Sequence, residues 1–87
     1  MTNNRKHLRH QIRVSIKITH ESIGECLLET RDISDSGIFV IVNPQKMPDV
    51  GTVLKGQVQG MGEEGAIIDM VIVRVDKNGL GLRYVNL

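Results

Sequence analysis

Eighty-seven residues are enough for one domain, because domains usually span about 50–250 residues. A chain of this length leaves no room for a TIM barrel or a doubly wound nucleotide-binding fold, since the former alone needs about 200 residues or more. No apolar run is long enough for a transmembrane helix, and no apolar stretch follows the basic N-terminus as in a signal peptide. The single cysteine, Cys26, forms no internal disulfide and no cysteine-based zinc site, so we expect a reducing, cytoplasmic compartment.

Charge is unevenly distributed along the chain. Residues 1–20 contain five lysines and arginines and no acidic residue, whereas residues 21–87 contain six basic and ten acidic residues. The net charge of +1 therefore conceals a basic N-terminal segment. This asymmetry points to an anionic partner, although a charged segment that is merely solvated would have the same composition.

Apolar residues recur with a period of two through most of the sequence, which is typical of strands with one buried and one exposed face. The clearest case is the first, where Ile12, Val14, Ile16 and Ile18 alternate with polar residues. The same reasoning predicts six strands, over residues 12–19, 26–33, 38–42, 52–59, 66–75 and 80–85. No segment has the pattern of an amphipathic helix of normal length.

Glycine, proline and asparagine mark the connections between these strands. We expect turns or loops at residues 21–24, 44–51, 60–65 and 76–79. In the last of these, Asn78-Gly79 is a strong hairpin signal, with the Asn-Gly pair expected to supply positive φ values.

Six short strands joined by glycine turns predict an all-β fold, a small six-stranded antiparallel β-barrel, because closure removes exposed sheet edges. The whole chain, residues 1–87, is predicted to be a single domain. Residues 1–11 form a flexible basic arm and residues 12–87 form the barrel.

Several short motifs would suggest an enzyme or a metal site, but the surrounding sequence lacks the features that such sites need. The string GxGxxG at residues 60–65 lacks the following helix of a dinucleotide fingerprint, and two of its positions are glutamates. No serine lies in a nucleophile elbow, and His7 and His10 have no evident third metal ligand. We therefore expect no catalytic residues, no metal and no cofactor.

Two other motifs have the chemistry of a binding site. Arg5 and Arg9 are four residues apart in the basic arm, so both guanidinium groups can converge on one phosphate-bearing or guanine-bearing ligand. Asp32 and Ser34 project to the same side of an extended chain, where a carboxylate and a hydroxyl suit the N–H donors of guanine. Gly37 permits a positive φ or a close backbone approach. The second motif is also compatible with an ordinary turn.

The order and spacing of RxxxR and DxSxxG, in a β-rich chain of this size, resemble the PilZ domain family of bacterial receptors for cyclic di-GMP. The final strand, with its glycine–hydrophobic alternation at residues 79–84, is also similar to that family. The resemblance implies a split-barrel type of β-barrel. It also implies that Arg5 and Arg9 clamp the dinucleotide while Asp32, Ser34 and Gly37 hold it at the barrel.

Three residues of the basic segment are secondary candidates for the same site: Lys6, His10 and Arg13. Asn4 stands where many members of the family have a further arginine, which favours one ligand per chain. The chain ends directly after the last predicted strand, so we expect no substantial C-terminal helix and regard a homo-oligomer as one way to cover exposed apolar surface.

The resemblance implies a non-enzymatic receptor that acts on a separate effector protein, without membrane insertion. One alternative is a protein-interaction barrel of the same family that does not bind the dinucleotide. A second, weaker alternative is a small RNA-binding barrel. Binding of a nucleic-acid polymer is disfavoured, because Phe39 and Tyr84 are the only aromatic residues available for base stacking.

Overall fold

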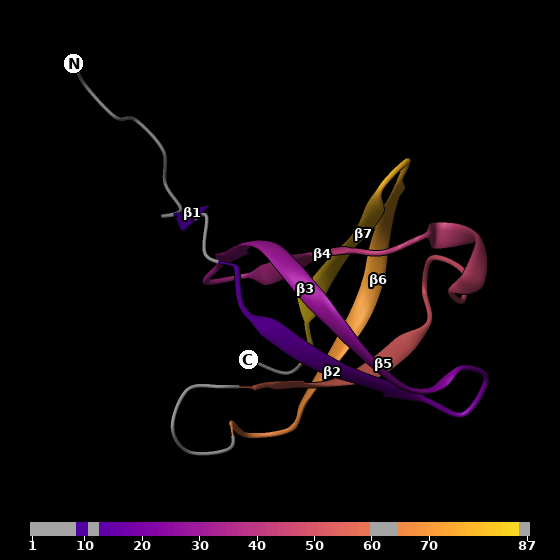
Figure 1. Ribbon diagram of the computed structural model, residues 1–87, viewed down its shortest axis with the longest axis horizontal. Coiled ribbons are helices and arrows are strands. Elements are labelled where there is room, and N and C mark those ends of the chain that lie inside the picture. The colour runs from indigo at the N-terminus through magenta and orange to yellow at the C-terminus, as the bar shows by residue number, and fades with distance from the viewer. Residues whose placement is uncertain (1–8, 11–12, 60–64, 86–87) are drawn as a thin grey trace.

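The computed structural model of the protein describes residues 9–10, 13–59 and 65–85, with the first two described by their backbone, and it consists almost wholly of strands (Figure 1). These are β1 (Arg9–His10), β2 (Ser15–His20), β3 (Gly24–Ser34), β4 (Gly37–Ile41), β5 (Val53–Val58), β6 (Ile68–Asp76) and β7 (Gly79–Tyr84). One short 3-10 turn, η1 (Pro44–Lys46), follows β4. No helix in the described part of the chain is long and apolar enough to span a membrane.

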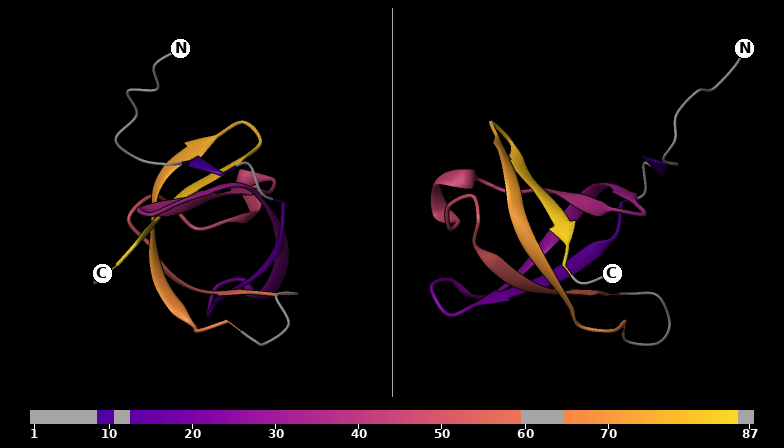
Figure 2. Two further views of the ribbon diagram at one scale, coloured as in Figure 1. Left: turned by 90° about the vertical axis from the view of Figure 1, so that its left-hand side faces the viewer. Right: turned by 180° about the vertical axis from the view of Figure 1, so that it is seen from behind.

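Six of these strands close into an antiparallel barrel, as predicted. The strands follow one another around it in the order β3, β2, β5, β6, β7 and β4, and β4 then pairs with β3 (Figure 2). The two-residue strand β1 is an addition that the sequence did not predict. It pairs with Ile33 and Ser34 at the end of β3, on the same edge of β3 that pairs with β2 over residues 24–29.

The inside of the barrel is a single apolar core. Its buried members alternate along the strands, as the period-two pattern requires, and they are Ile16, Ile18, Ile38, Val40, Leu54, Met70, Ile72, Leu80 and Leu82. Thr30 is the one polar residue among the buried side chains of the described residues, and its hydroxyl accepts a hydrogen bond from the amide of Val14 at 3.1 Å. Burial of the apolar face is the main force that fixes the strand registers.

The turns and loops between the strands lie largely where the sequence predicts them. Gly24 ends the first turn with a φ of 69°, and Gly51 has a φ of 96° in the loop before β5. Within that loop the sequence analysis missed η1, which is capped by Asn43, whose side-chain oxygen accepts a hydrogen bond from the amide of Gln45 at 3.0 Å. Of the predicted loop at 60–65, only Gly65 lies within the described residues.

The hairpin between β6 and β7 lies where predicted, but the role assigned to Gly79 was wrong. Gly79 is the first residue of β7, opposite Asp76, and it is not among the described glycines with positive φ. A Cβ at this position would collide with the carbonyl oxygen of Val40 and lie 2.6 Å from Cε1 of Phe39. Glycine is therefore required here because β4 and its phenyl ring pack directly against the backbone of β7.

We expect Gly79→Ala to lower the free energy of unfolding by about 1–3 kcal/mol, the usual cost of forcing extra atoms into a packed site. Gly81→Ala is the matched control in the same strand, because its Cβ would meet nothing closer than Cβ of Arg74, at 3.3 Å. Urea unfolding followed by circular dichroism measures both variants. Equal midpoints for the two would contradict the packing role of Gly79.

Candidate functional site

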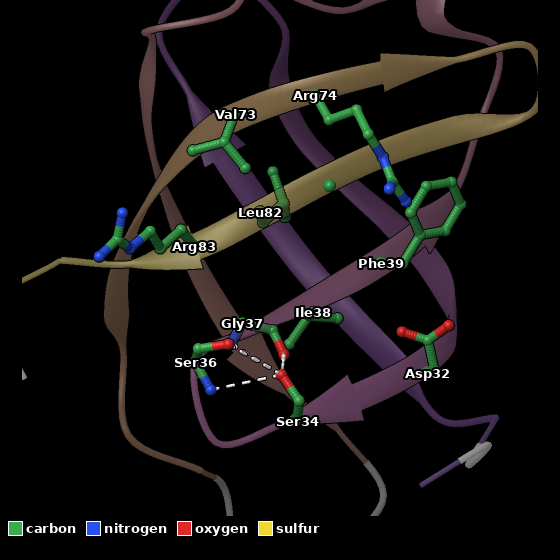
Figure 3. A pocket seen from close by; sticks show the side chains of 11 residues that line it. Asp32, Ser34, Ser36, Gly37, Ile38, Phe39, Val73, Arg74, Leu82 and Arg83 are labelled. Atoms are coloured by element: carbon green, nitrogen blue, oxygen red, sulfur yellow. Dashed lines mark hydrogen bonds between the residues drawn. The ribbon is translucent and has the colours of Figure 1, made fainter. Parts of the chain in front are cut away.

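A cavity of about 510 Å³ lies on the outer face of the barrel, over β3, β4, β7 and β6 (Figure 3). Its polar lining comes from Asp32 and Ser34 of β3, and from Arg74 and Arg83 of β6 and β7. Pockets for small ligands usually measure about 300–1,000 Å³, so this one is large enough for a nucleotide-sized molecule. The structure thus brings the predicted Asp32 and Ser34 together in one cavity.

Asp32 reaches the cavity because of a bulge in β3. Thr30 pairs with Val40 and Asp32 pairs with the next residue, Phe39, so Arg31 is the extra residue. Without this extra residue, regular alternation would turn Asp32 into the core beside Thr30. The carboxylate of Asp32 is 13% exposed, and its Oδ2 lies 3.4 Å from Nε of Arg31. A carboxylate is therefore held at the surface with little contact with water, which strengthens its interactions with a ligand.

Ser34 shapes the turn between β3 and β4. Its Oγ accepts hydrogen bonds from the amides of Gly37, at 3.2 Å, and Ser36, at 3.3 Å, and lies 3.3 Å from the carbonyl oxygen of Gly37 (Figure 3). These contacts are those of a serine turn, the alternative that the sequence left open. Its hydroxyl is thus already engaged in the structure of the rim.

The structure decides between the two possibilities that the sequence left open for Gly37: its φ is not positive, and another backbone segment approaches it closely. The approaching group belongs to the barrel itself. A Cβ on Gly37 would collide with the carbonyl oxygen of Leu82, in the neighbouring strand β7. Gly37 is therefore required for the contact between β4 and β7 beneath the cavity.

Tyr84 supports the same turn from β7. Its hydroxyl donates a hydrogen bond to the carbonyl oxygen of Ser34 at 3.3 Å, and its amide donates to the carbonyl oxygen of Ser36 at 3.0 Å. Burial raises the pKa of the phenol above its ordinary value of 10.0, and the negative charge of Asp35 raises it further. Because the ring also packs on the core, Tyr84 connects the rim of the cavity to the interior.

The described end of the basic segment, β1, pairs with the strand that contributes Asp32 and Ser34 to the cavity. Arg9 pairs with Ser34 and His10 with Ile33, so the backbone of the second RxxxR arginine lies beside the DxSxxG motif. Part of the predicted arm is therefore paired as a strand. Arg5 and Lys6 lie outside the described residues.

The structure does not bring Arg13 to this cavity. Nη1 of Arg13 lies 3.2 Å from Oε1 of Glu29, and both side chains are more than half exposed. Arg13 is absent from the described lining of the cavity and faces another part of the barrel surface.

The sequence analysis missed a cluster of arginines around one aromatic ring. Phe39 points outward from β4 yet is 3% exposed, because Arg31 and Arg74 lie over it, with Cζ atoms 3.8 Å and 5.3 Å from the ring centroid. On the outer face of β7, Gly79 leaves space for the ring of Phe39 and Gly81 leaves space for Arg74. In the sequence, the signal was the alternation of glycine and leucine at residues 79–82, which indicates that other side chains cover the outer face of this strand.

Fold and site together define a small closed β-barrel domain with a ligand-sized cavity on its outer face, lined by residues of the DxSxxG motif. The family model for the PilZ domain matches residues 3–87, and the chain belongs to this family.

A solved structure described as the Bacillus subtilis inhibitor of motility (MotI/DgrA) has the same fold. It superposes with a TM-score of 0.73 and 19% sequence identity, over 99% of this chain and 44% of the other. The present chain thus spans less than half of that protein. No curated protein matches the sequence.

The single tyrosine allows a direct test of the environment of Tyr84, by absorbance titration of the phenolate near 295 nm. We expect a midpoint above pH 10 in the folded protein, and a lower midpoint in Asp35→Asn, which removes the second cause of the raised pKa. The stability that the neutral phenol contributes is complete below the unfolded pKa of about 10 and is lost as the pH rises through the folded pKa. A midpoint at or below that of the urea-unfolded chain would contradict the burial of this group.

Proposed function

We propose that this protein is a receptor for cyclic di-GMP, and that the cavity over β3, β4, β7 and β6 is the binding site. The observation that carries the proposal is the pairing of β1 with β3, in which Arg9 lies opposite Ser34. In this register the backbone of Arg9 lies beside Ser34 of the DxSxxG motif, whose side chain lines the cavity. Membership of the PilZ domain family supports the same ligand.

The residues suit a ligand with two phosphates and two guanine bases. Guanidinium groups, as in Arg5 and Arg9, bind phosphate oxygens or the O6/N7 edge of guanine in bidentate fashion. The carboxylate of Asp32 accepts hydrogen bonds from the N1–H and N2–H₂ groups of a guanine. Ser34 and Gly37 set the shape of the turn against which the ligand rests, because their polar groups are bonded to each other.

Signalling in this proposal proceeds without chemistry on the ligand. The basic arm, which includes Arg5, Lys6 and His10, closes over the bound dinucleotide, and the closed arm offers a new surface to a separate effector protein in the cytoplasm. Ordering of the arm costs part of the contact energy, and the change in surface transmits the signal.

A second candidate function, a protein-interaction module that binds no dinucleotide, is favoured by the apolar surface of the barrel. Val53 and Val71 pair on the outer face of β5 and β6, and Val73 follows Val71 along β6. Val53 and Val73 are each about half exposed. A partner protein could cover this strip with or without ligand, so ligand binding decides between the two functions.

Calorimetric titration with cyclic di-GMP, with cyclic di-AMP and GTP as control ligands, tests the proposal. We expect binding confined to cyclic di-GMP, and a loss of at least about 1.5–3 kcal/mol of binding free energy in Arg9→Ala, the usual value of a hydrogen bond to a charged group. Arg13→Ala is the matched control, because Arg13 does not line the cavity as described and should leave affinity unchanged. Absence of binding by the unaltered protein would favour the interaction module instead.

Asp32→Ala should weaken cyclic di-GMP binding by a similar amount, because the guanine donors lose their charged acceptor. The ion pair with Arg31 is partly exposed, so the cost to folding should be small. Asp49→Ala, which removes an exposed carboxylate outside the cavity, is the control. If a folded Asp32→Ala protein binds as tightly as the unaltered one, Asp32 does not contact the guanine.

A further inference from the structure

Arg74 is placed in the cavity by the second bulge of the barrel. Ile72 pairs with Leu82 and Arg74 pairs with Gly81, so Val73 is the extra residue of β6. Regular alternation after the buried Ile72 would have directed Arg74 into the core. The bulge turns it to the outer face instead, as bulges commonly do next to functional sites.

The guanidinium of Arg74 is supported from below. Its Cζ lies 5.3 Å from the centroid of Phe39, a distance at which a cation is attracted to the ring face. Gly81 contributes no side chain beneath it, and a Cβ there would lie 3.3 Å from Cβ and 3.6 Å from Nε of Arg74. The side chain therefore rests on a flat surface made by Phe39 and the backbone of β7.

The other two arginines near the cavity are placed differently. Arg31 also lies over Phe39 but is ion-paired with Asp32. Arg83 pairs with Gly37 and lies at the opposite end of the cavity from Phe39 (Figure 3). Among the described residues, Arg74 has no carboxylate within ion-pair distance. The buried ring of Phe39 is closed to a ligand, and the exposed Arg74 that lies over this ring offers its guanidinium to the cavity instead.

We propose that Arg74 is a further ligand-binding residue, whose guanidinium stacks on a purine base while Asp32 holds the edge of that base. The inference rests on the proposed function, since it assumes a guanine dinucleotide in this cavity. Figure 3 shows Asp32 and Arg74 on either side of Phe39, at the same end of the cavity. An arginine on an aromatic ring thus replaces the aromatic platform that the sequence lacks, because guanidinium planes stack on π-systems as aromatic rings do.

The test is calorimetric titration of cyclic di-GMP into the unaltered protein, Arg74→Ala, Arg74→Lys and the control Arg83→Ala. We expect Arg74→Ala to lower the affinity by about 5- to 150-fold, which corresponds to the 1–3 kcal/mol measured for stacking one base. Arg74→Lys retains the charge and the aliphatic stem but not the planar group, so it should bind nearly as weakly as Arg74→Ala. Arg83→Ala should change affinity by less than either.

The outcomes separate this inference from the proposed function. If the unaltered protein binds no cyclic di-GMP, both are wrong. If it binds and Arg74→Ala binds equally well, only the role of Arg74 is wrong. Full affinity in Arg74→Lys would overturn stacking in favour of charge alone. Thermal unfolding shows whether each variant is folded, and Arg74→Lys, which keeps its stem over Gly81, still decides the question if Arg74→Ala is unstable.

Discussion

A closed barrel gives each side chain only two directions, into the core or out to the surface. In this protein the buried side chains of the described residues are apolar apart from Thr30, and burial of that face fixes the registers. The site depends on two departures from this alternation. The bulges at Arg31 and Val73 turn Asp32 and Arg74 to the outside, where regular strands would have buried both charges. The cavity lies on the strands between these two bulges.

The close approach of β4 and β7 is the second feature that joins fold and site. Gly37 and Gly79 face carbonyl oxygens of the opposite strand at distances that admit no side chain. This contact lets the ring of Phe39 pack against the backbone of β7 at Gly79, and it positions the turn that Ser34 stabilises. Tyr84, at the end of β7, donates a hydrogen bond from its hydroxyl to the carbonyl oxygen of Ser34. The rim of the cavity is thereby connected to the core through one side chain.

Much of the fold could be predicted because alternation and turn residues are local signals. The six strands of the barrel, the hairpin after Asp76 and the antiparallel closure all follow from them. The glycines show where local reasoning ends. Gly79 was expected to supply a positive φ, and Gly37 either a positive φ or a close backbone approach, whereas each is required by a neighbouring strand that is distant in sequence. The pairing of Arg9 with Ser34 could not be predicted from the sequence either, because a strand of two residues is too short to show an alternating pattern.

The sequence by itself determined the class of fold, the family and the two motifs, because these depend on residue type and spacing along the chain. Only the tertiary structure decided which residues share the cavity. Phe39, Arg31 and Arg74 come together from β3, β4 and β6, and no periodicity links them. A bulge depends on how one strand fits its partners, so the outward direction of Arg74 is a property of the closed sheet and not of its local sequence.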